Sequence, residues 1–84
     1  MFYVYILQSQ STGKLYIGQT NNLNDRVARH NANRNNYTKF KGPWLLLFAL
    51  EFHKRSEAVV FERKLKSWKS SKAVLAWIDK NNEV

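Results

Sequence analysis

The sequence contains no cysteine, only three glycines and only two histidines among its 84 residues. Without cysteine the chain forms neither disulfides nor thiolate metal sites, and two histidines are too few for a histidine-rich zinc centre. Three scattered glycines do not make a glycine-rich phosphate loop. These absences exclude disulfide-stabilised proteins, enzymes with cysteine or histidine-rich zinc centres, and enzymes with a glycine-rich phosphate loop. The lack of cysteine agrees with the reducing cytoplasm, where we expect the protein to reside.

Long hydrophobic runs are also missing. The longest apolar run, Pro43 to Leu50, is far too short to span a bilayer, and the N-terminus lacks the basic region and cleavage site of a signal peptide. We therefore expect a soluble protein without a membrane partner. Hydrophobic residues make up 44% of the chain, which is enough apolar material for one small folded domain over residues 1–84.

Acidic residues are scarce. Six aspartates and glutamates oppose fourteen lysines and arginines, which gives a formal net charge of +8 at pH 7. Such an excess favours a polyanionic partner, namely DNA, RNA or an anionic membrane. The basic residues are spread along the chain, which indicates a folded basic surface rather than a disordered arm. The alternative is a basic protein without a specific partner, because charge alone governs solubility and association.

The first half of the chain predicts a hairpin followed by a helix. Residues 2–8 and 14–19 are rich in β-branched and aromatic residues, and the short turn between them favours an antiparallel pair of strands. Asn21 or Asn22 is a suitable N-cap for a helix that we expect to reach about Arg34.

The second half predicts one strand and two helices. The apolar run 44–53 is typical of a strand buried on both faces. Ser56 is the expected N-cap of a helix over 57–69, and Ser70 or Ser71 that of a last helix. The order β-β-α-β-α-α predicts an α+β domain with a small three-stranded sheet.

Two basic side chains in the first helix share one position relative to its apolar stripe. Arg26 and His30 lie one turn apart, at the edge of the stripe that Leu23 and Val27 form. This placement suits a guanidinium that grips a phosphate with an imidazole as its neighbour. The simpler interpretation is a basic helix face with a histidine at its boundary.

A single carboxylate, Glu62, lies in an otherwise basic and apolar segment, at the margin of a buried stripe. The simpler interpretation is a surface ion pair with Lys66 four residues on, worth about a few tenths of a kcal/mol. The alternative is one oxygen ligand for Mg²⁺, an ion that takes only one or two protein carboxylates. The stripe consists of Ala58, Phe61, Leu65 and Trp68.

Tyrosines stand out in the hairpin. Tyr3 and Tyr5 share one face of the first strand, and Tyr16 projects from the second. A phenol has a pKa of about 10 and is a poor base unless neighbouring cations lower that pKa. Arg26 and a bound metal would supply such charges. Tyrosines are common in half-buried strands, however, and we prefer this structural interpretation for Tyr3.

Taken together, these residues resemble the GIY-YIG nuclease superfamily, in particular its small single-domain bacterial branch. The set is also similar to the N-terminal nuclease domain of a bacterial excision-repair enzyme and to homing endonucleases. Tyr3-Val4-Tyr5 stands where the first signature triplet belongs, and Tyr16-Ile17-Gly18 matches the second. The spacing of Arg26 and His30 fits the family pattern, as does Glu62 on the helix after the third strand.

The resemblance implies a three-stranded antiparallel sheet packed by helices, and cleavage of a nucleic-acid phosphodiester with Mg²⁺ or Mn²⁺. DNA is favoured over RNA, in repair or recombination. The resemblance implies that Tyr16 is the general base or orients the attacking water, with Tyr5 assisting. It further implies that Arg26 stabilises charge on the phosphate, His30 positions or helps to deprotonate the nucleophile, and Glu62 holds the metal.

Two departures from the family pattern, together with a chain too short for a separate targeting domain, motivate an alternative, a non-catalytic basic module that binds DNA or RNA and keeps the fold. Gln19 stands where some repair nucleases have lysine, and residues 66–76 contain no asparagine. Tyr3 replaces the first glycine of the signature, but small members of this type resemble the sequence there, so this departure is discounted. Such a module binds in a salt-sensitive manner. The expected nucleic-acid contacts, for either function, are Arg29, Lys39, Lys41, Arg63, Lys66 and Lys69.

Aromatic residues of the central loop offer a second mode of contact. Tyr37 and Phe40 are candidates for stacking on unpaired bases, and so is Trp44, although core packing is favoured for Trp44. A third and weaker hypothesis is a basic protein of a membrane surface or of the ribosome, because the last helix is amphipathic. Its apolar face is more simply part of the core. The sequence predicts no oligomeric state.

Overall fold

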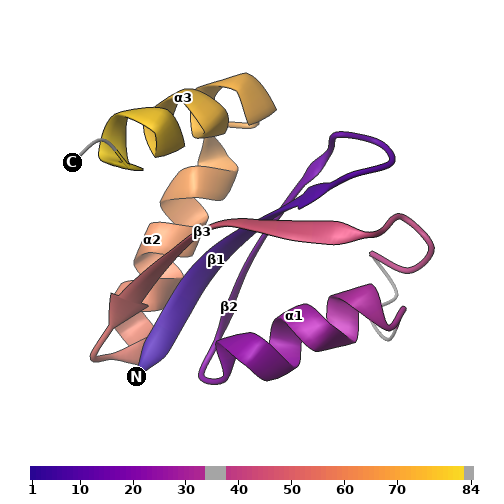
Figure 1. The fold of residues 1–84 in the computed structure, drawn as a ribbon. Helices are drawn as coiled ribbons and strands as arrows, with labels where there is room; N and C mark the ends of the chain where they lie inside the picture. The colour runs from indigo at the N-terminus through magenta and orange to yellow at the C-terminus, as the bar shows by residue number, and fades with distance from the viewer. Residues whose placement is uncertain (34–37, 83–84) are drawn as a thin grey trace.

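The computed structural model describes residues 1–33 and 38–82 (Figure 1). The predicted element order β-β-α-β-α-α and the α+β class are confirmed. The predicted stacking role of Tyr37 falls outside the described residues. The elements are β1 (Phe2–Ser9), β2 (Leu15–Thr20), α1 (Leu23–Asn31), β3 (Trp44–Phe52), α2 (Arg55–Ser67) and α3 (Ser71–Asn82).

The sheet is antiparallel throughout, with strand order β2-β1-β3. The hairpin turn is closed by Gly13, whose φ of 78° suits glycine, and by Ser9 Oγ, which accepts hydrogen bonds from two turn amides. The register places Tyr5 opposite Gly18 and Leu7 opposite Tyr16. The central strand β1 therefore brings its odd-numbered residues beside Tyr16 and Gly18 on one face.

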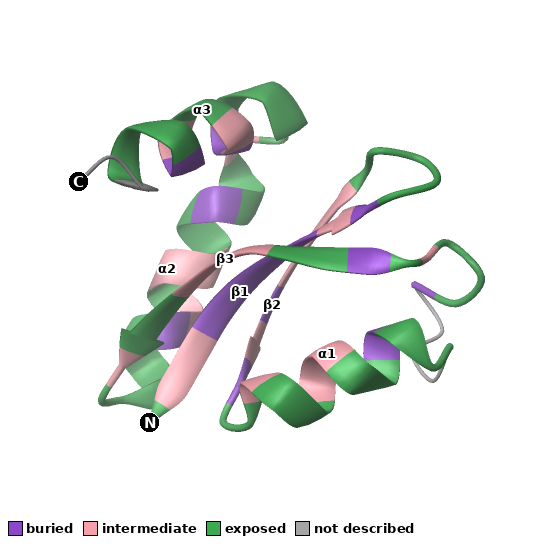
Figure 2. Cartoon of the chain, in the orientation of Figure 1, coloured by how far each residue is buried: buried purple, intermediate pink, exposed green. Residues whose placement is uncertain are grey.

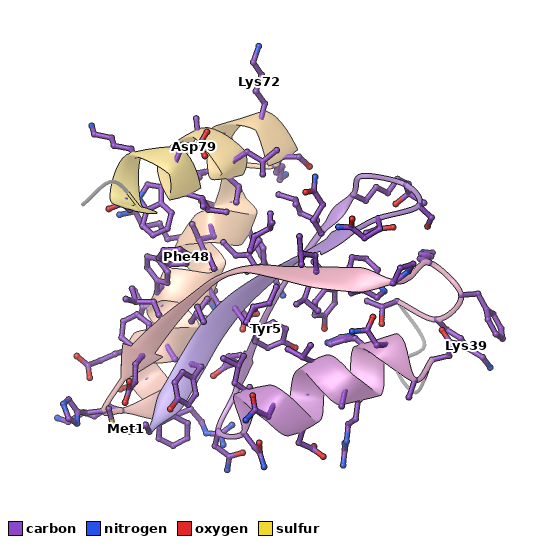
Figure 3. All side chains as sticks on the ribbon, viewed as in Figure 1. Met1, Tyr5, Lys39, Phe48, Lys72 and Asp79 are labelled. Atoms are coloured by element: carbon purple, nitrogen blue, oxygen red, sulfur yellow. The ribbon has the colours of Figure 1, made fainter. Side chains whose placement is uncertain are left out.

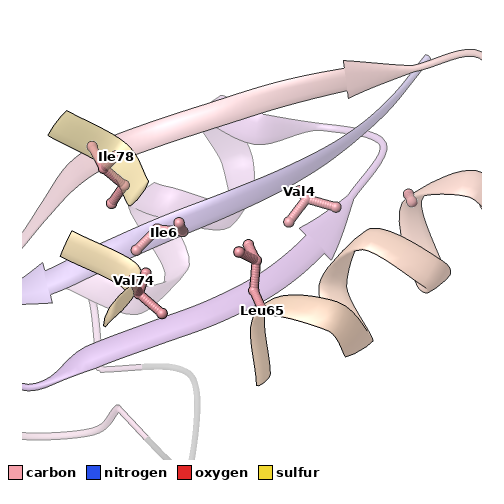
Figure 4. Packing of buried hydrophobic residues seen from close by; sticks show 6 residues of the cluster. Val4, Ile6, Leu65, Val74 and Ile78 are labelled. Atoms are coloured by element: carbon pink, nitrogen blue, oxygen red, sulfur yellow. The ribbon is translucent and has the colours of Figure 1, made fainter. Parts of the chain in front are cut away.

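Helices cover both faces of the sheet, α1 on one side and α2 with α3 on the other (Figure 1). Against α2 and α3, Val4 and Ile6 of β1 pack with Leu65, Val74 and Ile78 (Figure 4). Burial is concentrated along β1 and on the inward faces of the helices (Figure 2). On the α1 side a second cluster contains Tyr5, Leu7 and Trp44, with Tyr16, Leu23, Val27 and Ala49 packed against it.

The prediction that the third strand is buried on both faces is wrong. β3 pairs with β1 alone and lies at the edge of the sheet, as far as the described residues go. Leu45 is 51% exposed, Leu46 37% and Leu50 38%. An unbroken apolar run indicates a strand, but it does not reveal whether both faces are covered. Trp44, in contrast, is buried as predicted.

The helix boundaries follow local hydrogen bonding. Asn22 is the N-cap of α1, since its Oδ1 accepts from the Asp25 amide at 3.1 Å. α1 ends at Asn31, earlier than predicted, because Asn33 adopts a left-handed conformation with φ 61°. The prediction of Ser56 as an N-cap is wrong, because β3 is followed so closely by α2 that Lys54 holds the cap position.

The last helix confirms two predictions. Ser70 Oγ accepts from the Ala73 amide at 3.2 Å, as expected of a residue that caps α3. Val74 and Ile78 are buried, so the apolar face of α3 belongs to the core. Within the part of the chain that the structure describes, no helix has the length and apolar character needed to cross a bilayer.

Candidate active site

Tyr5 and Gly18 form one packed unit across two strands. Tyr5 is fully buried on the α1 face of β1, directly opposite Gly18. A Cβ atom at Gly18 would lie 2.6 Å from Tyr5 Oη and 2.8 Å from Tyr5 Cζ. The glycine of the second triplet is therefore required by the space that the tyrosine ring of the first strand occupies.

Replacing Gly18 with alanine is expected to destabilise the protein by about 1–3 kcal/mol, because the enclosed Tyr5 ring has no space into which to move. Urea unfolding monitored by circular dichroism measures the change. In a Tyr5→Phe background the closest atom is gone, so the penalty of Gly18→Ala is expected to be smaller. An equal penalty in both backgrounds would show that the contact with Tyr5 is not its cause.

A buried chain of hydrogen bonds connects Tyr5, His30 and Thr38. Tyr5 Oη lies 3.0 Å from His30 Nε2, and His30 Nδ1 lies 2.7 Å from Thr38 Oγ1. All three residues are completely buried. The sequence places His30 only at the boundary of the core and does not reveal Thr38, because a threonine in an irregular loop carries no periodic signal.

The surroundings of this hydrogen-bonded chain keep the Tyr5 phenol and the His30 imidazole uncharged. Burial, followed by the proximity of Tyr16, raises the pKa of Tyr5, although Arg26 acts in the opposite direction. Burial and then Arg26 lower the pKa of His30. The phenol thus stays protonated and the imidazole neutral, with one ring nitrogen donating and the other accepting.

Asn31 connects the end of α1 to the start of β3 through two hydrogen bonds. Its Oδ1 accepts from the Trp44 amide at 2.7 Å, and its Nδ2 donates to the Trp44 carbonyl at 3.2 Å. The indole Nε1 of Trp44 donates to the Thr38 carbonyl at 3.2 Å. These contacts hold His30 in place. They join residues 6 and 13 positions apart in the sequence, and no sequence motif marks Asn31.

Arg26 and Tyr16 complete the group on the α1 side. Arg26 is half-buried one turn before His30, and its Nε is buried without a hydrogen-bond partner in the described part of the chain. The Tyr16 ring lies 4.7 Å from the His30 ring and 6.2 Å from that of Tyr5, between centroids. The structure therefore brings together the four side chains that the sequence singles out as catalytic candidates.

Glu62 approaches from α2, on the other side of the sheet. Its Oε2 lies 2.7 Å from Lys66 Nζ, so the ion pair expected of a surface glutamate is present. The Glu62 side chain is nevertheless only 16% exposed. Its charge also helps to raise the pKa of Tyr5, which places the carboxylate within electrostatic reach of the phenol. Of the groups that act on the pKa of Tyr5, Glu62 has the smallest effect.

The carboxylate of Glu62 has the chemistry to hold Mg²⁺. Among the residues described, no three histidine, aspartate or glutamate side chains gather to form a protein-only metal site. Mg²⁺ often takes a single protein carboxylate, with waters and substrate phosphate as its other ligands. One shielded carboxylate fits this pattern, and Lys66 is the cation with which a metal would compete.

A cleft of about 570 Å³ lies between β2 and the junction of α2 with α3. Tyr16 lines this cleft and also contacts His30, so the cleft adjoins the group formed by Tyr5, Tyr16, Arg26 and His30. Lys66, Lys69 and two serine hydroxyls supply its polar groups. The full lining is Leu15, Tyr16, Ile17, Leu65, Lys66, Lys69, Ser70, Ser71 and Val74.

The predicted nucleic-acid contacts are all exposed and form two groups. Near the end of α1, the Arg29 Nε is paired with Asp25 Oδ2 at 3.1 Å, and the Lys39 Nζ lies 5.1 Å from the centre of the Phe40 ring. Lys41 follows in the same loop. The second group, Arg63, Lys66 and Lys69, lies on and just after α2.

Comparison with known proteins agrees with this arrangement. The family profile described as the GIY-YIG catalytic domain matches residues 1–74. A UPF0213 protein of Oceanobacillus iheyensis is 38% identical over 65 residues, which cover 76% of this chain and 74% of that protein. A UPF0213 protein of Staphylococcus haemolyticus is 37% identical over 67 residues, covering 79% and 80%.

A solved structure extends the agreement to the fold. The solution NMR structure of a UPF0213 protein from Bacillus halodurans has a TM-score of 0.60 and 28% sequence identity, over 94% of this chain and 84% of that one. The α+β fold of the present chain therefore matches that of a UPF0213 protein. With its two signature triplets, its family profile and these relatives in agreement, the chain belongs to the GIY-YIG family, whose members are typically nucleases.

Proposed function

We propose that the protein is a metal-dependent endonuclease that cleaves a DNA phosphodiester, in repair or recombination. The observation that carries the proposal is the buried Nε of Arg26, which has no partner in the described chain and lies in a group with two phenols and an imidazole. A guanidinium with an unused donor suits the forked recognition of a phosphate. The membership of the GIY-YIG family supports the same reaction class.

In the proposed reaction Arg26 binds the scissile phosphate and stabilises the charge that develops on it. Tyr5 stays protonated because burial raises its pKa, and its hydrogen bond with His30, which is in turn hydrogen-bonded to Thr38, holds the ring in place beside Tyr16. This leaves Tyr16, which is only half-buried, to orient the attacking water and, as the phenolate, to accept its proton.

Glu62 would hold the metal. When bound, Mg²⁺ or Mn²⁺ supplies positive charge to the phosphoryl oxygen and to the leaving group. Arg63 and Lys69, together with Arg29, Lys39 and Lys41, would bind neighbouring phosphates. Lys66 would shift from the carboxylate of Glu62 to the substrate.

The proposal is tested with purified protein on supercoiled plasmid, on single-stranded DNA and on branched DNA, with Mg²⁺, with Mn²⁺ or with EDTA. We expect nicking that requires the metal. Matched RNA substrates show which nucleic acid is preferred. Cleavage in EDTA, or no cleavage of any substrate with either metal, would contradict the proposal.

One observation favours a second candidate, a non-catalytic nucleic-acid-binding module. The ammonium of Lys66 already neutralises the carboxylate of Glu62, so the fold satisfies this residue without a metal. Such a module binds without Mg²⁺, and its affinity falls steeply as salt is added. Affinity without cleavage in the same assays would identify this function.

A further inference from the structure

The loop over residues 38–43 is held firmly to the rest of the molecule. Its first residue, Thr38, is hydrogen-bonded to His30, and the amide of Phe40 donates a hydrogen bond to Asn33 Oδ1 at 3.0 Å. The carbonyl of Lys41 accepts from Ser9 Oγ and from a second serine in the β1–β2 turn. At the end of the loop the Pro43 carbonyl accepts from the Gln10 amide at 2.8 Å.

Phe40 points away from this anchored backbone. Its exposure is 79%, so core packing does not account for the aromatic side chain. Its backbone is left-handed, with φ 62°, a conformation that costs a bulky residue roughly 1–2 kcal/mol. The fold thus holds an apolar ring in solvent on a hydrogen-bonded and strained backbone. Such features often have a functional reason.

The ammonium group of Lys39 lies beside the Phe40 ring. The Nζ atom of Lys39 lies 5.1 Å from the centre of the Phe40 ring, and Lys41 is exposed on its other side in the sequence. Figure 3 shows Lys39 directed outward at the far end of the loop, whereas Tyr5 lies between the sheet and α1. An exposed aromatic face with flanking cations is the combination that binds single strands, through base stacking and phosphate contacts.

We propose that Phe40, with Lys39, is a stacking platform for an unpaired base, and that the substrate carries a single-stranded segment beside the cleaved bond. Duplex bases have their faces covered by their neighbours, so only an unpaired base offers a free face to the ring. Thr38 couples the platform to the site, because it is two residues from Phe40 and hydrogen-bonded to His30. The position of the cleaved bond rests on the proposed function; the binding does not.

The test measures binding without cleavage. Fluorescence anisotropy in EDTA follows the wild type, Phe40→Ala and Phe40→Trp with a labelled oligothymidine and with a labelled duplex of equal length. We expect Phe40→Ala to weaken binding of the single strand by about tenfold, the scale of one stacked base. The duplex is expected to lose less than about twofold, and Phe40→Trp to retain single-strand binding.

Val60→Ala is the matched control, because Val60 is also an apolar side chain with 67% exposure and lies on α2. It is expected to leave both affinities unchanged. Equal losses on single strand and duplex, or none for Phe40→Ala, would overturn the platform. So would a Phe40→Ala defect confined to anionic vesicles of phosphatidylserine and phosphatidylcholine. Since EDTA prevents metal-dependent nicking, these outcomes are independent of whether the protein is a nuclease.

Discussion

Glu62→Gln is expected to reduce metal-dependent nicking by about a hundredfold or more, because a neutral amide replaces the carboxylate proposed to hold the metal. The side chain keeps its shape, and the exposed Lys66 loses an ion pair worth only about a few tenths of a kcal/mol. The free energy of unfolding is therefore expected to change little. Rates on a supercoiled plasmid, at several Mg²⁺ concentrations, measure the effect.

Glu57→Gln is the matched control for this substitution. Glu57 lies in the first turn of the same helix and is exposed, so the change removes the same charge at a distance from the tyrosines. Nicking by Glu57→Gln is expected to equal that of the wild type. Direct titration with Mn²⁺, followed by electron paramagnetic resonance, should show weaker binding for Glu62→Gln alone. Wild-type nicking by Glu62→Gln would refute the metal role.

Arg26→Ala is expected to lower nicking by about a thousandfold, the scale of removing a guanidinium from a phosphoryl-transfer site. Arg26→Lys is expected to recover only a small part of this loss, since an ammonium keeps the charge without the planar fork. Arg26 also hydrogen-bonds to Tyr5, so the free energy of unfolding of both variants is measured by urea unfolding beside the nicking rate. A loss of activity in variants that remain folded assigns the effect to the site.

The comparison for Arg26 is Arg29, which lies on the same helix. Arg29 is exposed and paired with Asp25 through an N–O distance of 3.1 Å, so Arg29→Ala removes the same charge from the outer side of α1. Arg29→Ala is expected to weaken DNA binding modestly and to reduce the salt dependence, with the cleavage rate at saturating DNA unchanged. A parallel loss of rate in both variants would mean that Arg26 acts only through general charge.

Periodicity is sufficient to predict the parts of the site that lie on helices. It places Arg26 and His30 at one edge of an apolar stripe, and both lie with Tyr5 on the α1 side of the sheet. It places Glu62 at the margin of another stripe, and the structure shows that side chain largely shielded. Helical spacing determines which face a residue shares, so such positions can be predicted from the sequence.

The contacts that hold these side chains in place are not predictable in the same way. Thr38 and Asn31 act across loops, where neither period nor motif fixes the partner. The role of Gly18 depends on the size of Tyr5 in the neighbouring strand, which becomes apparent only from the register. The exposure of β3 depends on strand order, and the composition of a single strand does not encode it.

The leucines of β3 lie at an edge of the sheet that no described strand pairs, and this affects the protein at high concentration. An open apolar edge is a template for strand pairing between molecules. The net charge of +8 opposes such encounters through mutual repulsion, which added salt screens over about 8 Å at physiological ionic strength. Colloidal stability therefore depends on the same positive charge that attracts a polyanion, and a bound nucleic acid that neutralises this charge would allow neighbouring molecules to approach edge to edge.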